Sequence, residues 1–250
     1  MTQSIPSLVA HRGYARRYPE NTLLALQAAV DAGATYLEFD VLLTQDRVPV
    51  LFHDRNLQRM CGQQGAVHDY TLAQLKQFSV SEFDRFGYRF VGNPISTLQE
   101  TVAYLAGQPA VQAFVELKRQ SIEQFGVEAV IDAVLPLLEP VRHQVIIISY
   151  SLEALRAVRE HSSYHLGAVF DHWHERKQTL IQILLPELFF TDFEQLPRFG
   201  KLKHPQCKLA VYDCVDPEQA LRVHRRGVDL VETFAIAEMR ESLDLYPEWR

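Results

Sequence analysis

Two pairs of charged residues, each embedded in an apolar run, are the first sign of chemistry in this sequence. Glu38 and Asp40 lie two positions apart in YLEFDVLL, and Glu116 and Lys118 lie two apart in AFVELK. Residues two apart on a strand project from the same side, roughly 6 to 7 Å apart. Because burying carboxylates without a cation is costly, the pattern predicts one of two arrangements. Either Glu38, Asp40 and Glu116 hold a divalent ion, or these acids form structural ion pairs with Arg12, Lys118 or another base.

The ligand types indicate which ion such a site would hold. Three carboxylates, with no metal-ligand spacing of cysteines and no clustered histidine pairing, suit Mg²⁺ or Ca²⁺ better than zinc. Mg²⁺ commonly keeps waters and binds through a few carboxylates together with substrate phosphate oxygens. A phosphate substrate would therefore complete the coordination sphere of one divalent cation, with Lys118 as a fixed positive charge beside it.

Two histidines follow strands and are candidates for proton transfer. His11 and Arg12 come directly after the first apolar run, and His53 ends PVLFH. If these strand ends share one rim, two imidazoles on opposite sides of a phosphorus would supply one base and one acid, which suits phosphodiester cleavage. The sequence does not say which histidine is which. Taken alone, His11 and Arg12 could equally be a strand-end pair that makes ordinary surface hydrogen bonds.

Apolar runs of strand length alternate with helical patterns, and this alternation predicts parallel α/β architecture. The candidate strands are SLVAH, YLEFDVLL, PVLFH, AFVELK, QVIIIS, HLGAVF, LFFTD, KLAVYD and DLVETF. PVLFH follows YLEFDVLL after a short turn at residues 45–47, so we interpret these two as a hairpin, which leaves eight strands. Thr22, Ser151 and Asp216 are placed to cap the helices that follow them. Eight strand–helix units in 250 residues predict a (β/α)₈ TIM barrel, with an open doubly wound sheet as the rival fold.

The interval from about 55 to 95 has no clear strand and is interpreted as a small insertion after the second strand. Its aromatic residues are Phe78, Phe83, Phe86, Tyr88 and Phe90. An insertion at this place lies on the catalytic face of a barrel, so these rings could roof a pocket. For most of them a small core within the insertion is the expected role.

Composition restricts the class of protein. The formal net charge is -6, which argues against a basic nucleic-acid-binding surface but allows an anionic small molecule. Three cysteines without metal-ligand spacing favour a reducing compartment. The segment MTQSIPSLVAHRG lacks signal-peptide character, and no apolar run reaches the ~20 residues of a membrane span. We therefore expect one cytoplasmic barrel domain over residues 1–250, without a stable membrane anchor and without any feature that predicts its oligomeric state.

Several motifs, in order along essentially the whole chain, resemble the glycerophosphodiester phosphodiesterase family. They are HRG at 11–13, PENT at 19–22, GATYLEFDVLLTQD at 33–46, VLFHD at 50–54 and VELK at 115–118, followed by ISYSLEAL and GVDLVET. Several short motifs in the correct order are a specific signal, whereas any one alone is weak. The first 120 residues carry most of the specificity.

The resemblance implies a (β/α)₈ barrel that hydrolyses glycerophosphodiesters to glycerol phosphate and an alcohol with a divalent metal. By position, the family's metal ligands match Glu38, Asp40 and Glu116, and its acid–base pair matches His11 and His53. The phosphate-neutralising groups match Arg12 and Lys118. The asparagine near the site matches Asn21, which is expected to contact the substrate, while Thr22 is expected to be the helix cap. Tyr212 replaces a tryptophan that the family usually has in the seventh strand, and it could stack against the alcohol portion.

The resemblance is weaker after residue 200, where the family's closing Thr-Asp reads Thr233-Phe234. This departure affects the expected substrate range and the identity of the alcohol more than the reaction type. Two alternatives follow. One is a lysophospholipase D-like activity on a lipid phosphodiester, favoured if Phe78, Phe83, Phe86 and Phe90 form an apolar groove. The other is a barrel that binds a phosphorylated metabolite without turnover.

Overall fold

Eight parallel strands form a closed barrel, which confirms the predicted TIM-barrel fold. The computed structural model describes residues 5–245. The first four residues of MTQSIPSLVAHRG, the segment expected not to be a signal peptide, therefore lie outside the described residues. The parallel strands are β1 (Ser7–Ala10), β2 (Tyr36–Leu43), β4 (Gln112–Leu117), β5 (Val145–Ser149), β6 (His165–Phe170), β7 (Leu188–Asp192), β8 (Lys208–Tyr212) and β9 (Leu230–Thr233). Strand β1 closes the barrel because it pairs with β9 through Val9↔Glu232 and with β2 through Val9↔Tyr36.

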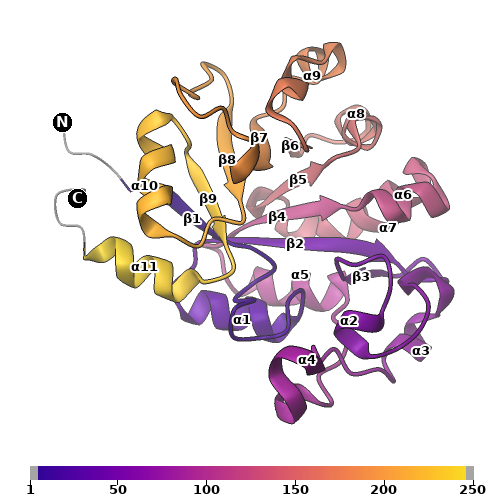
Figure 1. The fold of residues 1–250 in the computed structure, drawn as a ribbon. Coiled ribbons are helices and arrows are strands. Elements are labelled where there is room, and N and C mark those ends of the chain that lie inside the picture. The colour runs from indigo at the N-terminus through magenta and orange to yellow at the C-terminus, as the bar shows by residue number, and fades with distance from the viewer. Residues whose placement is uncertain (1–4, 246–250) are drawn as a thin grey trace.

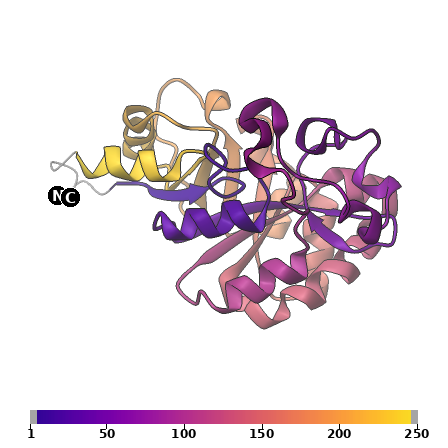
Figure 2. The same cartoon turned by 90° about the horizontal axis from the view of Figure 1, so that it is seen from below.

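Helices follow the strands and surround the barrel (Figure 1). They are α1 (Leu23–Asp31), α5 (Leu98–Ala106), α6 (Arg119–Phe125), α7 (Val127–Leu138), α8 (Leu152–His161), α9 (Thr179–Leu184), α10 (Pro217–Arg226) and α11 (Ile236–Asp244). The predicted caps are confirmed, because the side chains of Thr22, Ser151 and Asp216 each accept a backbone N–H in the first turn of the helix that follows. Figures 1 and 2 show α1 and α11 side by side, where Arg240 donates to the carbonyl of Ala32.

The predicted hairpin and insertion are both present. Strand β3 (Pro49–Leu51) runs antiparallel to the last part of β2. The insertion that follows contains α2 (Gln58–Cys61), α3 (Leu72–Leu75), α4 (Phe83–Phe86) and two 3₁₀ helices, Val67–Asp69 and Gly87–Phe90. Its own small core packs against β3 and includes Leu57, Met60, Val67, Leu75, Val80 and Ile95.

The aromatic residues of the insertion do not line the cavity at the barrel rim, and of the five only Phe78 belongs to the small core that was expected for most of them. They pack mainly against one another, with Phe83 edge-on to Tyr88 and Phe86 edge-on to Phe90. Phe83 and Tyr88 are exposed, and only Phe78 packs against the core of the insertion. The apolar groove that would have favoured a lipid substrate is therefore not formed.

Successive side chains of each strand point alternately toward the surrounding helices and into the barrel interior. On β2, Leu37, Phe39 and Val41 belong to the large core beneath the helices, whereas Glu38 and Asp40 point to the other side. The barrel interior below these carboxylates is apolar and contains Val9, Phe114, Ile148, Phe190, Ala210 and Leu230. The strands thus place these buried carboxylates at one end of a packed barrel. Within residues 5–245, no helix is both long enough and apolar enough to cross a membrane.

Candidate active site

A tight turn after β1 places His11 and Arg12 at the rim of the barrel. Gly13 follows with φ of 80°, and a Cβ at this position would lie 2.6 Å from the backbone carbon of Ala25 in α1. Only glycine allows this close approach. Arg12 itself has φ of 56°, and its carbonyl accepts the backbone N–H of Asn21 at 3.1 Å. The sequence HRG therefore builds a strained turn that is held against the first helix.

Three carboxylates from two neighbouring strands converge beside this turn. The strand register pairs Asp40 on β2 with Glu116 on β4, and Glu38 lies on the same face as Asp40. All three are buried, and ligand oxygens from the three residues lie within 4.8 Å of one another. The predicted cluster is therefore present, with a geometry that could hold a metal ion.

Two basic side chains neutralise part of this charge. Lys118 Nζ lies 3.0 Å from Asp40 Oδ1 and 2.9 Å from Glu116 Oε1, and Arg12 Nε lies 3.3 Å from Asp40 Oδ2. Burial alone would raise the pKa of Asp40, but Lys118 and Arg12 hold it well below its ordinary value. The ion pairs anticipated as an alternative to metal binding thus exist, and they centre on Asp40.

The positive charges of Lys118 and Arg12 do not balance all the carboxyl groups of the site. Burial, together with the charges of Asp40 and Glu232, raises the pKa of Glu38 well above its ordinary value. Glu38 Oε1 and Glu232 Oε1 are buried and have no hydrogen-bond partner among the described residues. Four buried carboxyl groups, those of Glu38, Asp40, Glu116 and Glu232, share the site with two bases, the buried Lys118 and the half-buried Arg12. The site thus has two more carboxyl groups than bases, and two of its carboxyl oxygens have no donor. Both features fit a hard divalent cation.

Asn21 lies behind the carboxylates and does not line the cavity. Its Nδ2 donates to Asp40 Oδ2 at 2.7 Å, and its Oδ1 accepts the backbone N–H of Asp40 at 3.0 Å. Both amide atoms are therefore committed to Asp40. The structure places this residue as a support for a carboxylate, whereas the sequence analysis expected a contact with substrate.

Both predicted histidines line the same cavity. His11 Nδ1 lies 3.0 Å from Asp213 Oδ1, and its Nε2 lies 3.6 Å from Glu38 Oε2. Burial and the neighbouring Arg12 lower the pKa of His11, while Asp213 opposes the shift. His53 Nδ1 forms a hydrogen bond of 3.0 Å with Asp54 Oδ1.

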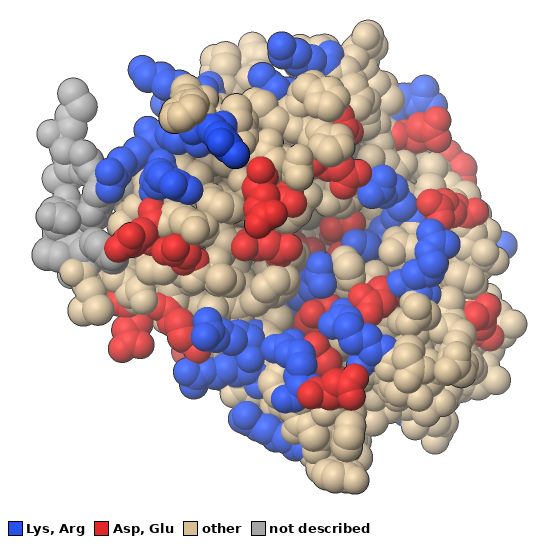
Figure 3. Space-filling view, viewed as in Figure 1, with Lys and Arg blue, Asp and Glu red and all other residues tan. Residues whose placement is uncertain are grey.

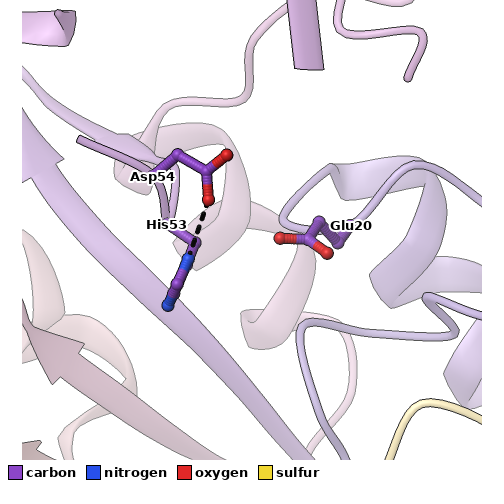
Figure 4. A group of neighbouring side chains, drawn as sticks. All are labelled: Glu20, His53 and Asp54. Atoms are coloured by element: carbon purple, nitrogen blue, oxygen red, sulfur yellow. Dashed lines mark hydrogen bonds and ion pairs between the residues drawn. The ribbon is translucent and has the colours of Figure 1, made fainter. Parts of the chain in front are cut away.

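A second group of possible metal ligands, Glu20, His53 and Asp54, lies nearby (Figure 4). Figure 4 shows Glu20 facing Asp54 across a gap, with a bond drawn only between His53 and Asp54. Arg59 bridges this gap, because its Nη2 donates to Glu20 Oε1 at 2.7 Å and to Asp54 Oδ1 at 2.8 Å. Glu20 Oε1 also accepts from Arg12 at 2.9 Å. These oxygens are already satisfied by guanidinium groups, so this cluster lacks the unpaired acceptors of the first.

The cavity has a volume of about 560 Å³. Its polar wall carries the histidines, the carboxylates, Arg12 and Lys118, together with Arg55, Arg119, Gln120, Glu123 and Asp213. Its apolar wall continues the barrel interior and is formed by Ile148, Tyr150, Val169, Phe190 and Tyr212. The hydroxyl groups of Tyr150 and Tyr212 lie 2.8 Å apart. In Figure 3, which has the same view as Figure 1, acidic and basic side chains surround a hollow near the middle of the face.

Two functional candidates were missed by sequence reasoning. Asp213 directly follows β8, where no motif marks it. Glu232 lies in the apolar run LVETF, at a position where alternation along the strand turns its side chain into the barrel. The same pattern identified Glu38. Applying the alternation argument to every strand would have found Glu232 but not Asp213.

Comparison with known proteins shows which family the chain is similar to. The sequence profile of the glycerophosphoryl diester phosphodiesterase family matches residues 11–233. A glycerophosphodiester phosphodiesterase of Caldanaerobacter subterraneus subsp. tengcongensis is 32% identical over 179 residues, which cover 67% of this chain and 70% of that protein. The human glycerophosphodiester phosphodiesterase 1 is 38% identical over 97 residues, but this match spans 39% of this chain and only 29% of the human protein.

Solved structures share the fold. A phosphodiesterase of Oleispira antarctica in complex with the product sn-glycerol-3-phosphate superposes with a TM-score of 0.83 at 24% identity, covering 96% of this chain and 97% of that one. A glycerophosphodiester phosphodiesterase of Thermotoga maritima superposes with a TM-score of 0.73 at 24% identity, covering 95% of this chain and 98% of that one.

Proposed function

Since the chain belongs to the glycerophosphoryl diester phosphodiesterase family, we propose that it hydrolyses glycerophosphodiesters to glycerol phosphate and an alcohol, using one divalent cation and two histidines. Membership of this family makes it a phosphoric diester hydrolase. One observation carries the finer proposal. Three buried carboxylates with an unpaired oxygen lie in the same cavity as two imidazoles, a lysine and an arginine.

In this proposal Glu38, Asp40 and Glu116 hold Mg²⁺ or Ca²⁺, and Asn21 fixes the orientation of Asp40. The cation, when bound, would draw electrons from the phosphodiester and offset the charge that develops on its oxygens. Lys118 and Arg12 keep Asp40 ionised for this task. Their guanidinium and ammonium groups also face the phosphate and add positive charge on the same wall.

His11 and His53 divide the proton transfers in this proposal. One removes a proton from the nucleophile, which is water or the neighbouring hydroxyl of the glycerol, and the other protonates the departing alcohol oxygen. Each imidazole has its Nδ1 beside a carboxylate, so in each ring the Nε2 is the nitrogen available for substrate. Tyr212 and Tyr150 form part of the apolar wall, where the alcohol portion of the substrate would lie.

A lipid diester is the less supported substrate. The phenylalanines that would have formed an apolar groove pack among themselves instead. The cavity of about 560 Å³ suits a small diester such as glycerophosphocholine or glycerophosphoethanolamine.

The test is release of choline from glycerophosphocholine, compared with its release from lysophosphatidylcholine, by chelated protein before and after addition of Mg²⁺ or Ca²⁺. We expect turnover of glycerophosphocholine only with a cation, and a fall of ~10²- to 10⁴-fold in His11→Ala and His53→Ala. Asp192→Asn, at the end of β7 and outside the cavity lining, is the matched control. Undiminished hydrolysis after exhaustive chelation would rule out the cation, and normal turnover in both histidine variants would rule out the proposed proton transfers.

A further inference from the structure

We infer that Asp213 is a positioning residue that holds the imidazole of His11, with Nδ1 toward the aspartate and Nε2 toward the carboxylate cluster and the substrate. This inference rests on the proposed function, because it assigns to Asp213 a role in the proton transfer by His11. It concerns a side chain that neither the motifs nor the resemblance identified.

The contacts of the His11 ring support this role from three directions. Asp213 Oδ1 lies 3.0 Å from Nδ1, and Glu38 Oε2 lies 3.6 Å from Nε2 on the other side of the ring. The ring of Phe234 stacks on the imidazole with a centroid distance of 4.6 Å and an interplanar angle of 11°. The imidazole is buried, so these contacts restrict both its rotation and the choice of which nitrogen faces the cavity.

The backbone brings the aspartate to this place. Asp213 follows the last residue of β8 and has φ of 64°, a left-handed conformation that aspartate and asparagine adopt more readily than most residues. The next residue, Cys214, donates its backbone N–H to Glu232 on β9, and His11 donates its own to Thr233 on β9. Because the same strand anchors both loops, the carboxylate and the imidazole are held at a fixed separation.

The chemical consequence is a defined tautomer. A carboxylate beside Nδ1 favours the proton on that nitrogen and leaves the Nε2 lone pair free. The residue then presents a base, or after protonation an acid, toward the diester. At His53 the Nδ1 forms a hydrogen bond of 3.0 Å with Asp54 Oδ1, whereas the 3.0 Å contact of His11 with Asp213 is an ion pair without hydrogen-bond alignment. Both histidines of the cavity therefore have a carboxylate at the same ring nitrogen.

The two segments that depart from the family's pattern both contact this ring. The chain has Tyr212 where the family usually has tryptophan, and Asp213 follows it. Phe234 occupies the place of the closing aspartate and stacks on His11. Phe234 and Asp213 thus both contact a single imidazole.

The test compares Asp213→Asn and Asp213→Gly, because both asparagine and glycine accept a φ of 64° and the side chain is 53% exposed, so neither change strains the fold. We expect kcat for glycerophosphocholine with Mg²⁺ to fall by about 10- to 100-fold in Asp213→Gly, with little change in KM and a smaller loss in Asp213→Asn. In the His11→Ala background, Asp213→Gly should cause no further loss. Asp192→Asn is again the control.

A second readout does not depend on activity. The ¹⁵N chemical shifts of His11 in metal-free protein at about pH 8 should report the proton on Nδ1 in the natural sequence. In Asp213→Gly the proton should move to Nε2. A full additional loss in the His11→Ala background, or an unchanged tautomer, would overturn the inference. Normal turnover of His11→Ala would instead overturn the proposed role of the histidine, and the NMR spectrum would still decide whether Asp213 sets the tautomer.

Discussion

At the scale of single residues, the site depends on carboxylates that the fold buries without full compensation. Asp40 forms ion pairs with Lys118 and Arg12 and accepts a hydrogen bond from Asn21, and these contacts lower its pKa. Glu38 and Glu232 each have a buried oxygen without a hydrogen-bond partner, and burial raises the pKa of each. This asymmetry is the physical reason to expect a cation, because a neutralised cluster would not need one.

The pH dependence of stability in a Glu232 variant tests whether this carboxyl group lacks compensation for its burial. Burial, followed by the charges of Asp213 and Glu116, raises its pKa well above the ordinary value. A carboxyl group with a raised pKa contributes stability below the ordinary pKa and loses that contribution as the pH rises through the folded-state pKa. In metal-free protein, Glu232→Gln should therefore increase the free energy of unfolding at pH 8 more than at pH 4, by about 1.4 kcal/mol for each pKa unit of the shift.

Urea denaturation of both proteins across this pH range is the measurement. A difference between Glu232→Gln and the natural sequence that stays constant with pH would show that this carboxyl group is not destabilised by burial.

Asn21 allows a test of how Asp40 is held. Its φ of 53° means that glycine can replace it without backbone strain, whereas alanine cannot. Asn21→Gly removes both hydrogen bonds to Asp40 and should weaken binding of Mg²⁺ or Ca²⁺ by about 10- to 100-fold. Isothermal titration calorimetry measures this directly. Unchanged affinity would mean that Lys118 and Arg12 alone orient the carboxylate.

At the scale of elements, the insertion contacts the site through arginines, of which Arg55 lines the cavity, and not through its aromatic rings. Arg59 on α2 binds Asp54, which holds His53, and Glu20, which binds Arg12. Its Nη1 also lies 3.2 Å from Glu82, whose burial raises its pKa. The short helix α2 is thereby connected to both sides of the rim.

Removing this arginine should therefore destabilise the protein more than removing an exposed one. Arg59→Leu leaves the buried Glu20 and Glu82 with fewer partners and should cost about 1–3 kcal/mol of unfolding free energy. Arg156→Leu breaks an exposed pair with Glu160 on α8 and should cost about 0.5 kcal/mol or less. Chemical denaturation of the two variants compares them. Equal losses would contradict a structural role for Arg59.

Much of the element level could be predicted from sequence because alternation and caps are local signals. The eight parallel strands, the hairpin and the cap at Thr22 were identified in this way. The environment of His11 was not predictable, because Asp213 is 202 positions away and only the closure of the barrel brings it near. The packing of Phe83 and Phe90 was missed for a similar reason, since composition does not reveal which neighbours a ring meets.

At the scale of the whole molecule, the site forms where the two ends of the barrel sheet join. Strand β1 lies between β9 and β2, so His11 meets Phe234, which follows the last strand, as well as Glu38 from the second. The sequence signals are strongest in the first 120 residues, yet the last strands complete the cavity. The catalytic arrangement thus depends on closure of the barrel.

The most direct test of the central claim is anomalous diffraction from crystals soaked with Mn²⁺, as a stand-in for Mg²⁺, together with glycerol 3-phosphate. The account predicts a single strong peak bonded to oxygens of Glu38, Asp40 and Glu116, with the phosphate beside it and His11 within reach. A peak at Glu20, His53 and Asp54 instead, or no peak between the three buried carboxylates, would contradict it.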